Sequence, residues 1–185
     1  MKEREEAICE AAARMFIRYG VKRTGMNDIA REAGIARQTL YNLFPNKETV
    51  LSATIRLVLD RELRQAESEL ASCSDLRDQL GIVFDHLARR PYAMLHSTPN
   101  AADIVEGVSE ESRKVIGEWR DNFRSVVERL LAPVNSNLIL SGITPHQLAD
   151  AVVNFASLSK YEARDHAHLD ELLLSLTKMA VRCAT

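Results

Sequence analysis

The polar residues with the most informative spacing lie between Gly34 and Pro45, in the stretch GIARQTLYNLFP. At helical spacing Leu40 and Phe44 point to one side of this stretch, and the polar residues point away from them. Arginine and glutamine side chains can distinguish guanine and adenine in a major groove, and hydroxyl groups suit phosphate oxygens. The residues suited to hydrogen bonding with nucleic acid are therefore Arg37, Gln38, Thr39, Tyr41 and Asn42.

These residues belong to the second of two short helical patterns that meet at Gly34, over residues 26–33 and 37–43. Two helices joined by a tight turn, with the second free to enter a major groove, form a helix-turn-helix. Lys47 follows in the first turn of the next helix, where its ammonium and the unpaired N–H groups can together hold a phosphate. Residues 29–47 therefore predict a DNA-reading element.

The rest of the composition predicts an all-α chain. With 185 residues, 46% of them hydrophobic, the chain can bury a core, and seven glycines and five prolines are few for its length. Apolar residues recur at helical rather than alternating spacing. The helix before Pro91 is expected to end at that proline. A loop is expected over residues 133–142. Longer helices are predicted over residues 6–19, 47–70, 76–90, 109–132, 144–164 and 168–183, and short pieces over 92–96 and 103–107.

The charge distribution has the sign expected if the N-terminal part meets phosphate. The whole chain carries a net charge of −2, yet its first 48 residues hold nine basic and seven acidic side chains. The cysteines Cys9, Cys73 and Cys183 are scattered and odd in number, which favours a reducing compartment. No secretion signal and no apolar run of membrane-spanning length is present, so we expect a cytoplasmic protein with no membrane partner.

Residues 7–59 resemble the DNA-binding domain of the TetR (tetracycline repressor) family of bacterial transcriptional regulators. The matching pattern is AAARMFIRYGVKRTGMNDIAREAGIARQTLYNLFPNKETVL. The resemblance implies a helix-turn-helix domain over residues 1–46 and an effector-binding and dimerisation domain over residues 47–185. It implies DNA-backbone contacts by Thr24, Thr39, Tyr41 and Lys47, and contacts to bases or nearby phosphates by Arg37, Gln38 and Asn42. The chain departs from the family pattern at Gly25, Ala36 and Leu43, where the family often has polar groups or, at Leu43, His or Tyr.

The larger C-terminal part resembles the family in the number and lengths of its helices. A small-molecule pocket is implied between the middle helices, and pairing of the last two helices with a second subunit is implied as well. The apolar pocket candidates are Phe84, Tyr92, Met94, Trp119 and Phe123, with His86 and His96 as polar anchors. The alternative is that these residues are core, since such stripes at helical spacing are usually packing.

The resulting expectation is a homodimeric, ligand-responsive repressor on a palindromic operator of double-stranded DNA, with no enzymatic activity and no cofactor. One alternative has the same architecture but activates transcription or responds to a protein partner. Another is a helical metal-binding protein or enzyme that uses the cluster Glu162, Asp165, His166 and His168. That cluster is also what a polar turn between helices would contain, so no metal ligands are assigned.

Overall fold

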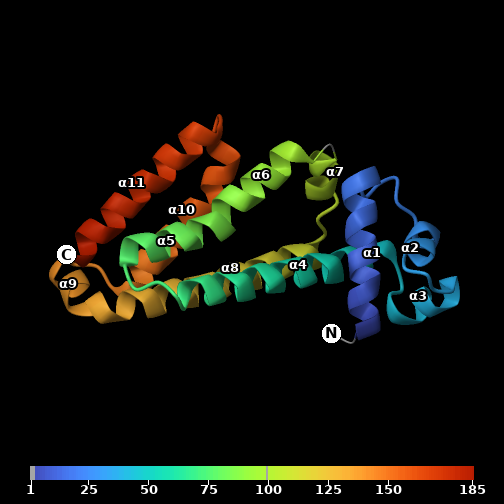
Figure 1. Cartoon of the computed structure of the whole chain (residues 1–185), viewed down its shortest axis with the longest axis horizontal. Helices are drawn as coiled ribbons and strands as arrows, with labels where there is room; N and C mark the ends of the chain where they lie inside the picture. Colours follow the sequence, from blue (N-terminus) through green and yellow to red (C-terminus); the bar gives the residue numbers. More distant parts are fainter. Residues whose placement is uncertain (1–2, 99) are drawn as a thin grey trace. The chain divides into compact units, whose positions relative to one another are not determined.

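A computed structural model of the chain describes residues 3–98 and 100–185 and shows helices joined by turns (Figure 1). Since no strand occurs among these residues, the predicted all-α fold class is confirmed. Within the same residues, no helix has both the length and the apolar character needed to cross a membrane. In chain order the elements are α1 (Glu3–Tyr19), α2 (Met26–Glu32), α3 (Arg37–Leu43), α4 (Lys47–Leu70), α5 (Leu76–Phe84), the π-helix η1 (Asp85–Arg89), α6 (Arg90–Ser97), α7 (Ala101–Glu106), α8 (Glu110–Leu131), the 3-10 helix η2 (Ala132–Val134), α9 (Asn135–Leu140), α10 (Pro145–Glu162) and α11 (His166–Ala184).

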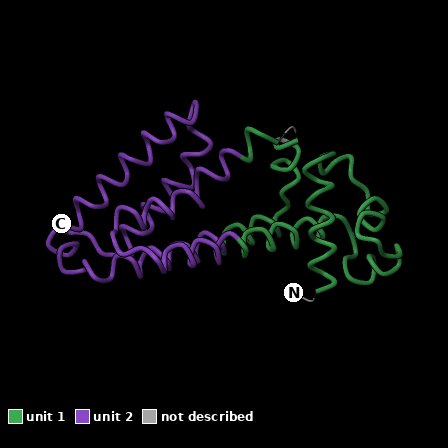
Figure 2. The backbone as a smooth tube through the Cα atoms, in the orientation of Figure 1, with its two compact units in different colours: residues 1–61, 94–118 green, residues 62–93, 119–185 purple. Residues whose placement is uncertain are grey.

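The helices form two compact units (Figure 2). Unit 1 takes in the chain up to residue 61 together with residues 94–118, and unit 2 consists of residues 62–93 and 119–185. The long helices α4 and α8 contribute residues to both units. The predicted functional boundary between residues 46 and 47 stays a prediction, because compact units record packing and not function.

Unit 1 is built on an apolar core shared by α1, α2, α3 and the start of α4. Ile8, Ala12 and Phe16 recur at helical spacing along α1 and are at most 3% exposed. Ile29 of α2 and Leu40 of α3 are fully buried in the same cluster. The amphipathic patterns read from the sequence therefore bury the faces that they predict.

The turn between α2 and α3 depends on Gly34. Its φ of +66° lies in the left-handed region, where a residue with a Cβ is strained. The Ile35 N–H donates to the Ala30 carbonyl at 3.0 Å and so closes the end of α2. The glycine predicted to separate two helices therefore reverses the chain just before α3.

Cys9 lies in the unit 1 core and is fully buried. Burial raises the pKa of its thiol to about 11, a shift that a hydrogen bond with Thr54 partly opposes. Because the thiolate is the reactive form, we expect Cys9 to resist alkylation by iodoacetamide at neutral pH in the folded protein. Cys73 and Cys183 are partly exposed and should react first, which peptide mass spectrometry would measure. Equal labelling of all three under native conditions would contradict this burial.

In unit 2, the helix predicted to stop before Pro91 continues through it, so that prediction was wrong. The π-helix η1 joins α5 to α6, and the Arg90 N–H reaches back five residues to the Asp85 carbonyl. Proline lacks the N–H that would bind the carbonyl four residues back, that of Leu87. Lys160 Nζ on α10 lies 3.4 Å from this carbonyl oxygen and donates to it. A side chain 73 residues away thus binds the carbonyl that the proline cannot serve.

The loop predicted over residues 133–142 was also wrong, because η2 and α9 occupy most of it. Leu138 of α9 is fully buried, and the Asn137 side-chain amide donates to the Ala184 carbonyl at 2.8 Å. Contacts with α11 support this short helix, and its local sequence gives no amphipathic pattern long enough to reveal it. The next helix begins as predicted, with the Thr144 hydroxyl accepting from the Gln147 N–H and Pro145 in the first turn.

Candidate nucleic-acid interface

The outward face of α3 carries the polar residues singled out in the sequence. Leu40 is fully buried and Phe44, which follows the helix, is 8% exposed, so these two side chains hold α3 against unit 1. Arg37, Gln38 and Asn42 are exposed, and Thr39 and Tyr41 are partly exposed. Neither α2 nor α3 has a side-chain N-cap, as expected from Gly25 and Ala36. The helix therefore presents polar groups that local burial does not consume.

Contacts within α3 order these polar groups. The Gln38 side-chain amide donates to Asn42 Oδ1 at 2.9 Å, one turn along the helix. The Arg37 guanidinium carbon lies 5.2 Å from the centre of the Tyr41 ring, in a cation–π contact. Both pairs leave hydrogen-bonding atoms facing solvent, so they restrict the side chains without satisfying them fully. A face ordered in this way loses less conformational entropy when it binds a surface.

Thr24 and Lys47, the predicted DNA contacts before α2 and after α3, differ in burial and in hydrogen bonding. Thr24 is 1% exposed, and its hydroxyl donates to the Gly20 carbonyl at 2.7 Å. A phosphate contact would require that hydroxyl to exchange partners, and its role at DNA stays a prediction. Lys47 is partly exposed and donates to the Val21 carbonyl at 2.6 Å. It also donates to the Lys22 carbonyl at 3.4 Å, and because an ammonium has three N–H donors, one remains to bind a phosphate.

Ion pairs determine which basic groups of unit 1 remain available. Arg14 pairs with Glu32 at 2.9 Å, Lys22 with Glu106 at 2.6 Å, and Arg31 with Asp28 at 2.5 Å. Among the described residues, no salt bridge engages Arg23, Arg37 or Lys47. Near the predicted DNA contacts, the cationic groups left for phosphate are therefore those before α2, at the start of α3 and at the start of α4. Elsewhere in unit 1, Arg4, Arg18 and Arg113 are also outside the salt bridges of the described residues.

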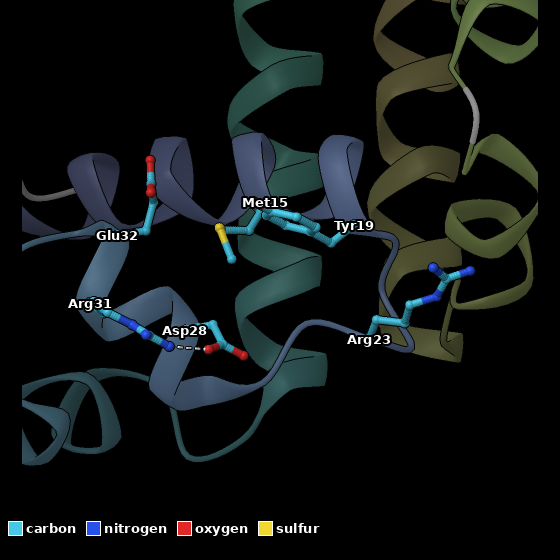
Figure 3. A pocket seen from close by; sticks show the side chains of 6 residues that line it. All are labelled: Met15, Tyr19, Arg23, Asp28, Arg31 and Glu32. Atoms are coloured by element: carbon cyan, nitrogen blue, oxygen red, sulfur yellow. Dashed lines mark hydrogen bonds and ion pairs between the residues drawn. The ribbon is translucent and has the colours of Figure 1, made fainter.

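Arg23 was missed in the sequence, although it adjoins the predicted contact Thr24. It lines a hollow of about 450 Å³ between α1, α2 and the loop that joins them. In Figure 3, Met15 and Tyr19 come from α1, and Arg31 extends toward Asp28, with which it pairs. The signal was the Lys22–Arg23 pair between two helices, but the sequence alone does not show that Lys22 is neutralised and Arg23 is not.

Four of the five predicted pocket residues are buried in unit 2. Phe84, Tyr92, Trp119 and Phe123 are at most 5% exposed. The Trp119 and Phe123 rings meet edge to face with centroids 4.9 Å apart. The fifth, Met94, belongs to unit 1 and is 45% exposed. The structure thus assembles part of the predicted set, and its role in binding a ligand stays a prediction.

The predicted polar anchors also have different surroundings. His86 is fully buried, with Nδ1 2.7 Å from Glu62 and Nε2 3.4 Å from Glu69. Arg90 donates to the same two carboxylates at 3.3 and 3.0 Å. His96 lies on the exposed end of α6. The ring nitrogens of His86 are therefore committed to glutamates, which leaves His86 poorly placed to hold a ligand.

The acidic and histidine cluster near residue 165 forms the start of α11. The Asp165 carboxylate accepts from the His168 N–H at 2.8 Å and caps the helix. The His166 ring meets Tyr92 edge to face at 4.7 Å, and Arg164 donates to His168. Among the described residues, no group of three or more His, Cys, Asp or Glu side chains is placed to hold a metal ion. These contacts account for the cluster structurally.

Comparison with known proteins agrees with this architecture. A family model described as "Bacterial regulatory proteins, tetR family" matches residues 8–54. The HTH-type transcriptional regulator BetI of Agrobacterium fabrum is 29% identical over 169 residues, which span 83% of this chain and 82% of BetI. A transcriptional regulator from Saccharomonospora viridis, solved with choline, superposes with a TM-score of 0.67 at 17% identity, covering 96% of this chain and 95% of that one. FadR from Bacillus subtilis, solved with stearoyl-CoA, gives 0.64 at 17% identity, with 95% and 96% covered.

The chain is all-α, and its N-terminal helices form a helix-turn-helix whose second helix presents an ordered polar face. These features define a DNA-binding protein of the helix-turn-helix class. The match over residues 8–54 includes both helices and the glycine turn between them. Residues 8–54 are a DNA-binding domain of the TetR family, and the whole chain is similar to transcriptional regulators.

Proposed function

We propose that this regulator is a ligand-responsive repressor that binds a palindromic operator as a homodimer in the cytoplasm and has no catalytic activity. The observation that carries the proposal is the ordered outer face of α3, set on a buried Leu40 and flanked by Arg23 and Lys47. Residues 1–46 would supply the contacts to DNA. Residues 47–185 would supply dimerisation and effector binding.

Exposed apolar residues on α10 and α11 support dimerisation. The sequence pattern puts more large apolar residues on these helices than one face needs, and several of them, such as Leu169 and Leu173, pack inside unit 2. Others remain exposed on α10 and α11. A second copy of the same two helices would cover these exposed apolar side chains. The exposed set is Phe155, Leu158, Tyr161, Leu174 and Met179, each between 40% and 61% exposed.

A two-fold dimer would read a two-fold operator. Two copies of α3 related by the axis would enter successive major grooves, about 34 Å apart, and would contact identical half-sites. An effector bound in unit 2 would favour a state with a different spacing of the two helices. Thermodynamic linkage then requires DNA to weaken effector binding by the same factor.

A small molecule is the effector class that two similar structures support. The Saccharomonospora viridis regulator was solved with choline and Bacillus subtilis FadR with stearoyl-CoA. The tight burial of Phe84, Tyr92 and Phe123 favours a second candidate, a regulator of the same architecture that answers to a protein partner. Saturable binding of a small molecule that releases the operator would decide for the first candidate.

The base and phosphate roles on α3 can be separated by substitution. Genomic fragments bound by the purified protein would supply the operator for measurements at several salt concentrations. Arg37→Ala should lower the preference for the operator over unrelated DNA, by about 1–3 kcal/mol if it removes one base contact. Lys47→Ala should weaken binding to both DNAs alike and reduce the salt dependence by about one counterion.

Two controls test whether these effects come from the removed DNA contacts. Arg129→Ala removes an equally charged, exposed side chain of unit 2 and should leave DNA binding unchanged. Because Lys47 also donates to the Val21 carbonyl, its variant needs an unfolding curve matching that of the wild type at the assay temperature. If no genomic fragment is bound selectively, or Arg37→Ala keeps full selectivity, the assigned reading face is wrong.

A further inference from the structure

Unit 2 contains a partly buried lysine that no carboxylate neutralises. Lys160 Nζ donates to the Leu87 carbonyl at 3.4 Å and lies 5.3 Å from the centre of the Tyr161 ring. No salt bridge joins it to any described acidic residue. Buried cations are normally paired, and a single long contact leaves N–H donors of this ammonium without a partner.

Three acidic side chains on α10 and the elements next to it pair with arginines and not with Lys160. Arg89 of η1 binds Asp85 at 2.7 Å and Asp170 of α11 at 2.6 Å. Asp150 of α10 binds Arg124 at 2.9 Å. Arg120 on α8 adds a second positive charge close enough to repel the Lys160 ammonium, and among the described residues it too has no salt bridge. Lys160 and Arg120 are therefore two interacting cations, on α10 and α8, that no ion pair among the described residues compensates.

Two further donors of unit 2 are buried without a partner. Among the described residues, neither the Trp119 indole N–H nor the Ser157 hydroxyl makes a hydrogen bond, although Trp119 is 5% and Ser157 4% exposed. A buried polar group without a hydrogen bond is unfavourable, so a group that accepts from these donors would stabilise the unit. Ser157 precedes Lys160 by three residues, so both lie on one side of α10.

The helix pairing brings these groups to the same stretch of unit 2. The Arg124–Asp150 ion pair and the contact of Glu128 with His146 show that α8 and α10 run antiparallel. Residues that precede Arg124 on α8 therefore face residues that follow Asp150 on α10. Trp119 and Arg120 lie on α8 before Arg124, and Ser157 and Lys160 lie on α10 after Asp150.

We propose that the α8–α10 pair binds the carboxylate of an acidic small molecule, with Trp119 Nε1, Ser157 Oγ and Lys160 Nζ as donors and Arg120 as a supporting charge. The indole, ammonium and guanidinium groups can only donate, and the Ser157 hydroxyl can donate as well, so a ligand with acceptor oxygens and negative charge suits all four. A carboxylate joined to an apolar body fits better than inorganic phosphate, because the donors lie beside aromatic rings that would contact a hydrocarbon part. The ring of Phe123, beside Trp119, would contact an apolar body.

The titration of Lys160 makes the proposed site sensitive to pH. Burial, with Arg120 adding to it, lowers the pKa of this lysine from its ordinary value to about 8. The ammonium is thus present below pH 8 and is lost above it, so carboxylate affinity should fall by tenfold or more between about pH 7 and pH 9.5. Other ionisable groups on α8, η1 and α11 next to this helix are Arg120, Arg124, Asp85, His86, Arg89, His166, His168 and Asp170.

Trp119 is the only tryptophan of the chain, so its fluorescence reports directly on this site. The purified full-length protein would be titrated with octanoate and benzoate, with 1-octanol and benzyl alcohol as uncharged counterparts, and with inorganic phosphate. We expect a saturable change with a carboxylate below about 10 mM, and binding at least tenfold weaker for the matching alcohol. Lys160→Met and Ser157→Ala should each weaken carboxylate binding, and Lys160→Arg should retain it at about pH 9.5.

Matched measurements separate the possible failures. Lys114→Met removes an exposed lysine of unit 1 and should leave the titration unchanged, and circular dichroism would check the fold of every variant. Equal binding of acids and alcohols, stronger binding of phosphate, or no response to any carboxylate would overturn this inference. The inference rests on the proposed effector response, so operator binding is measured on the same sample. Loss of operator binding would count against the proposed function, whereas intact operator binding without carboxylate binding would count against this site alone.

Discussion

Leu158→Asp is expected to produce a monomer that binds the operator about a hundredfold to ten-thousandfold more weakly than the wild type. Leu158 is 58% exposed on α10 and stands among the apolar residues proposed to meet a second subunit. A buried, unpaired carboxylate in such an interface is strongly unfavourable, because nothing there compensates its lost hydration. Without the partner, each half-site contact becomes an independent binding event. Analytical ultracentrifugation and operator titration would measure the two effects on one sample.

Leu140→Asp is the matched control for this prediction. Leu140 is a leucine on α9 with 87% exposure, so the same substitution there changes charge and surface polarity equally. It should leave both the sedimentation behaviour and the operator affinity unchanged. A Leu158→Asp protein that remains dimeric, or that binds the operator fully as a monomer, would rule out the proposed interface.

Leu40→Ala should lower the free energy of unfolding by about 2–5 kcal/mol. Leu40 is fully buried beneath the proposed reading face, so its truncation removes apolar contacts and leaves a cavity under α3. Because α3 has only seven residues, packing and not intrinsic helix propensity holds it in place. Urea unfolding followed by circular dichroism would measure the loss of stability. Operator binding should weaken at the urea concentrations at which the variant begins to unfold.

Leu43→Ala provides the comparison on the same helix. Leu43 is partly buried at the edge of the same core, and its truncation deletes the same atoms. Since its side chain contacts solvent, relaxation is easier and the expected loss is about 1–2 kcal/mol. If Leu40→Ala costs no more than Leu43→Ala, the inner face of α3 has been assigned wrongly.

The reading element was predictable because its determinants are local. Leu40 and Phe44 recur at helical spacing, Gly34 supplies a positive φ and Pro45 follows the end of the helix. The same reasoning predicted the start of the helix after Thr144. In each case the residues that determine the structure lie within a few positions of it, so one stretch of sequence contains the whole physical cause.

Two features depended instead on residues far apart in the chain. The helix continues through Pro91, and Lys160 donates to the Leu87 carbonyl that the proline leaves without an N–H partner. The sequence around the proline does not predict that distant donor. Whether Arg23 or Lys22 remains available for phosphate depends on Glu106, more than eighty residues away.

The fold class, the helix-turn-helix and its outward residues could be predicted from the sequence, because helical periodicity and turn chemistry are local properties. The packing of the helices was needed to show that Thr24 is buried and that four of the five pocket candidates lie in the interior. It was also needed to show that donors on α8 and α10 lack acceptors among the described residues. Burial and pairing are properties of groups brought together from distant positions. They therefore appear only when the helices are packed.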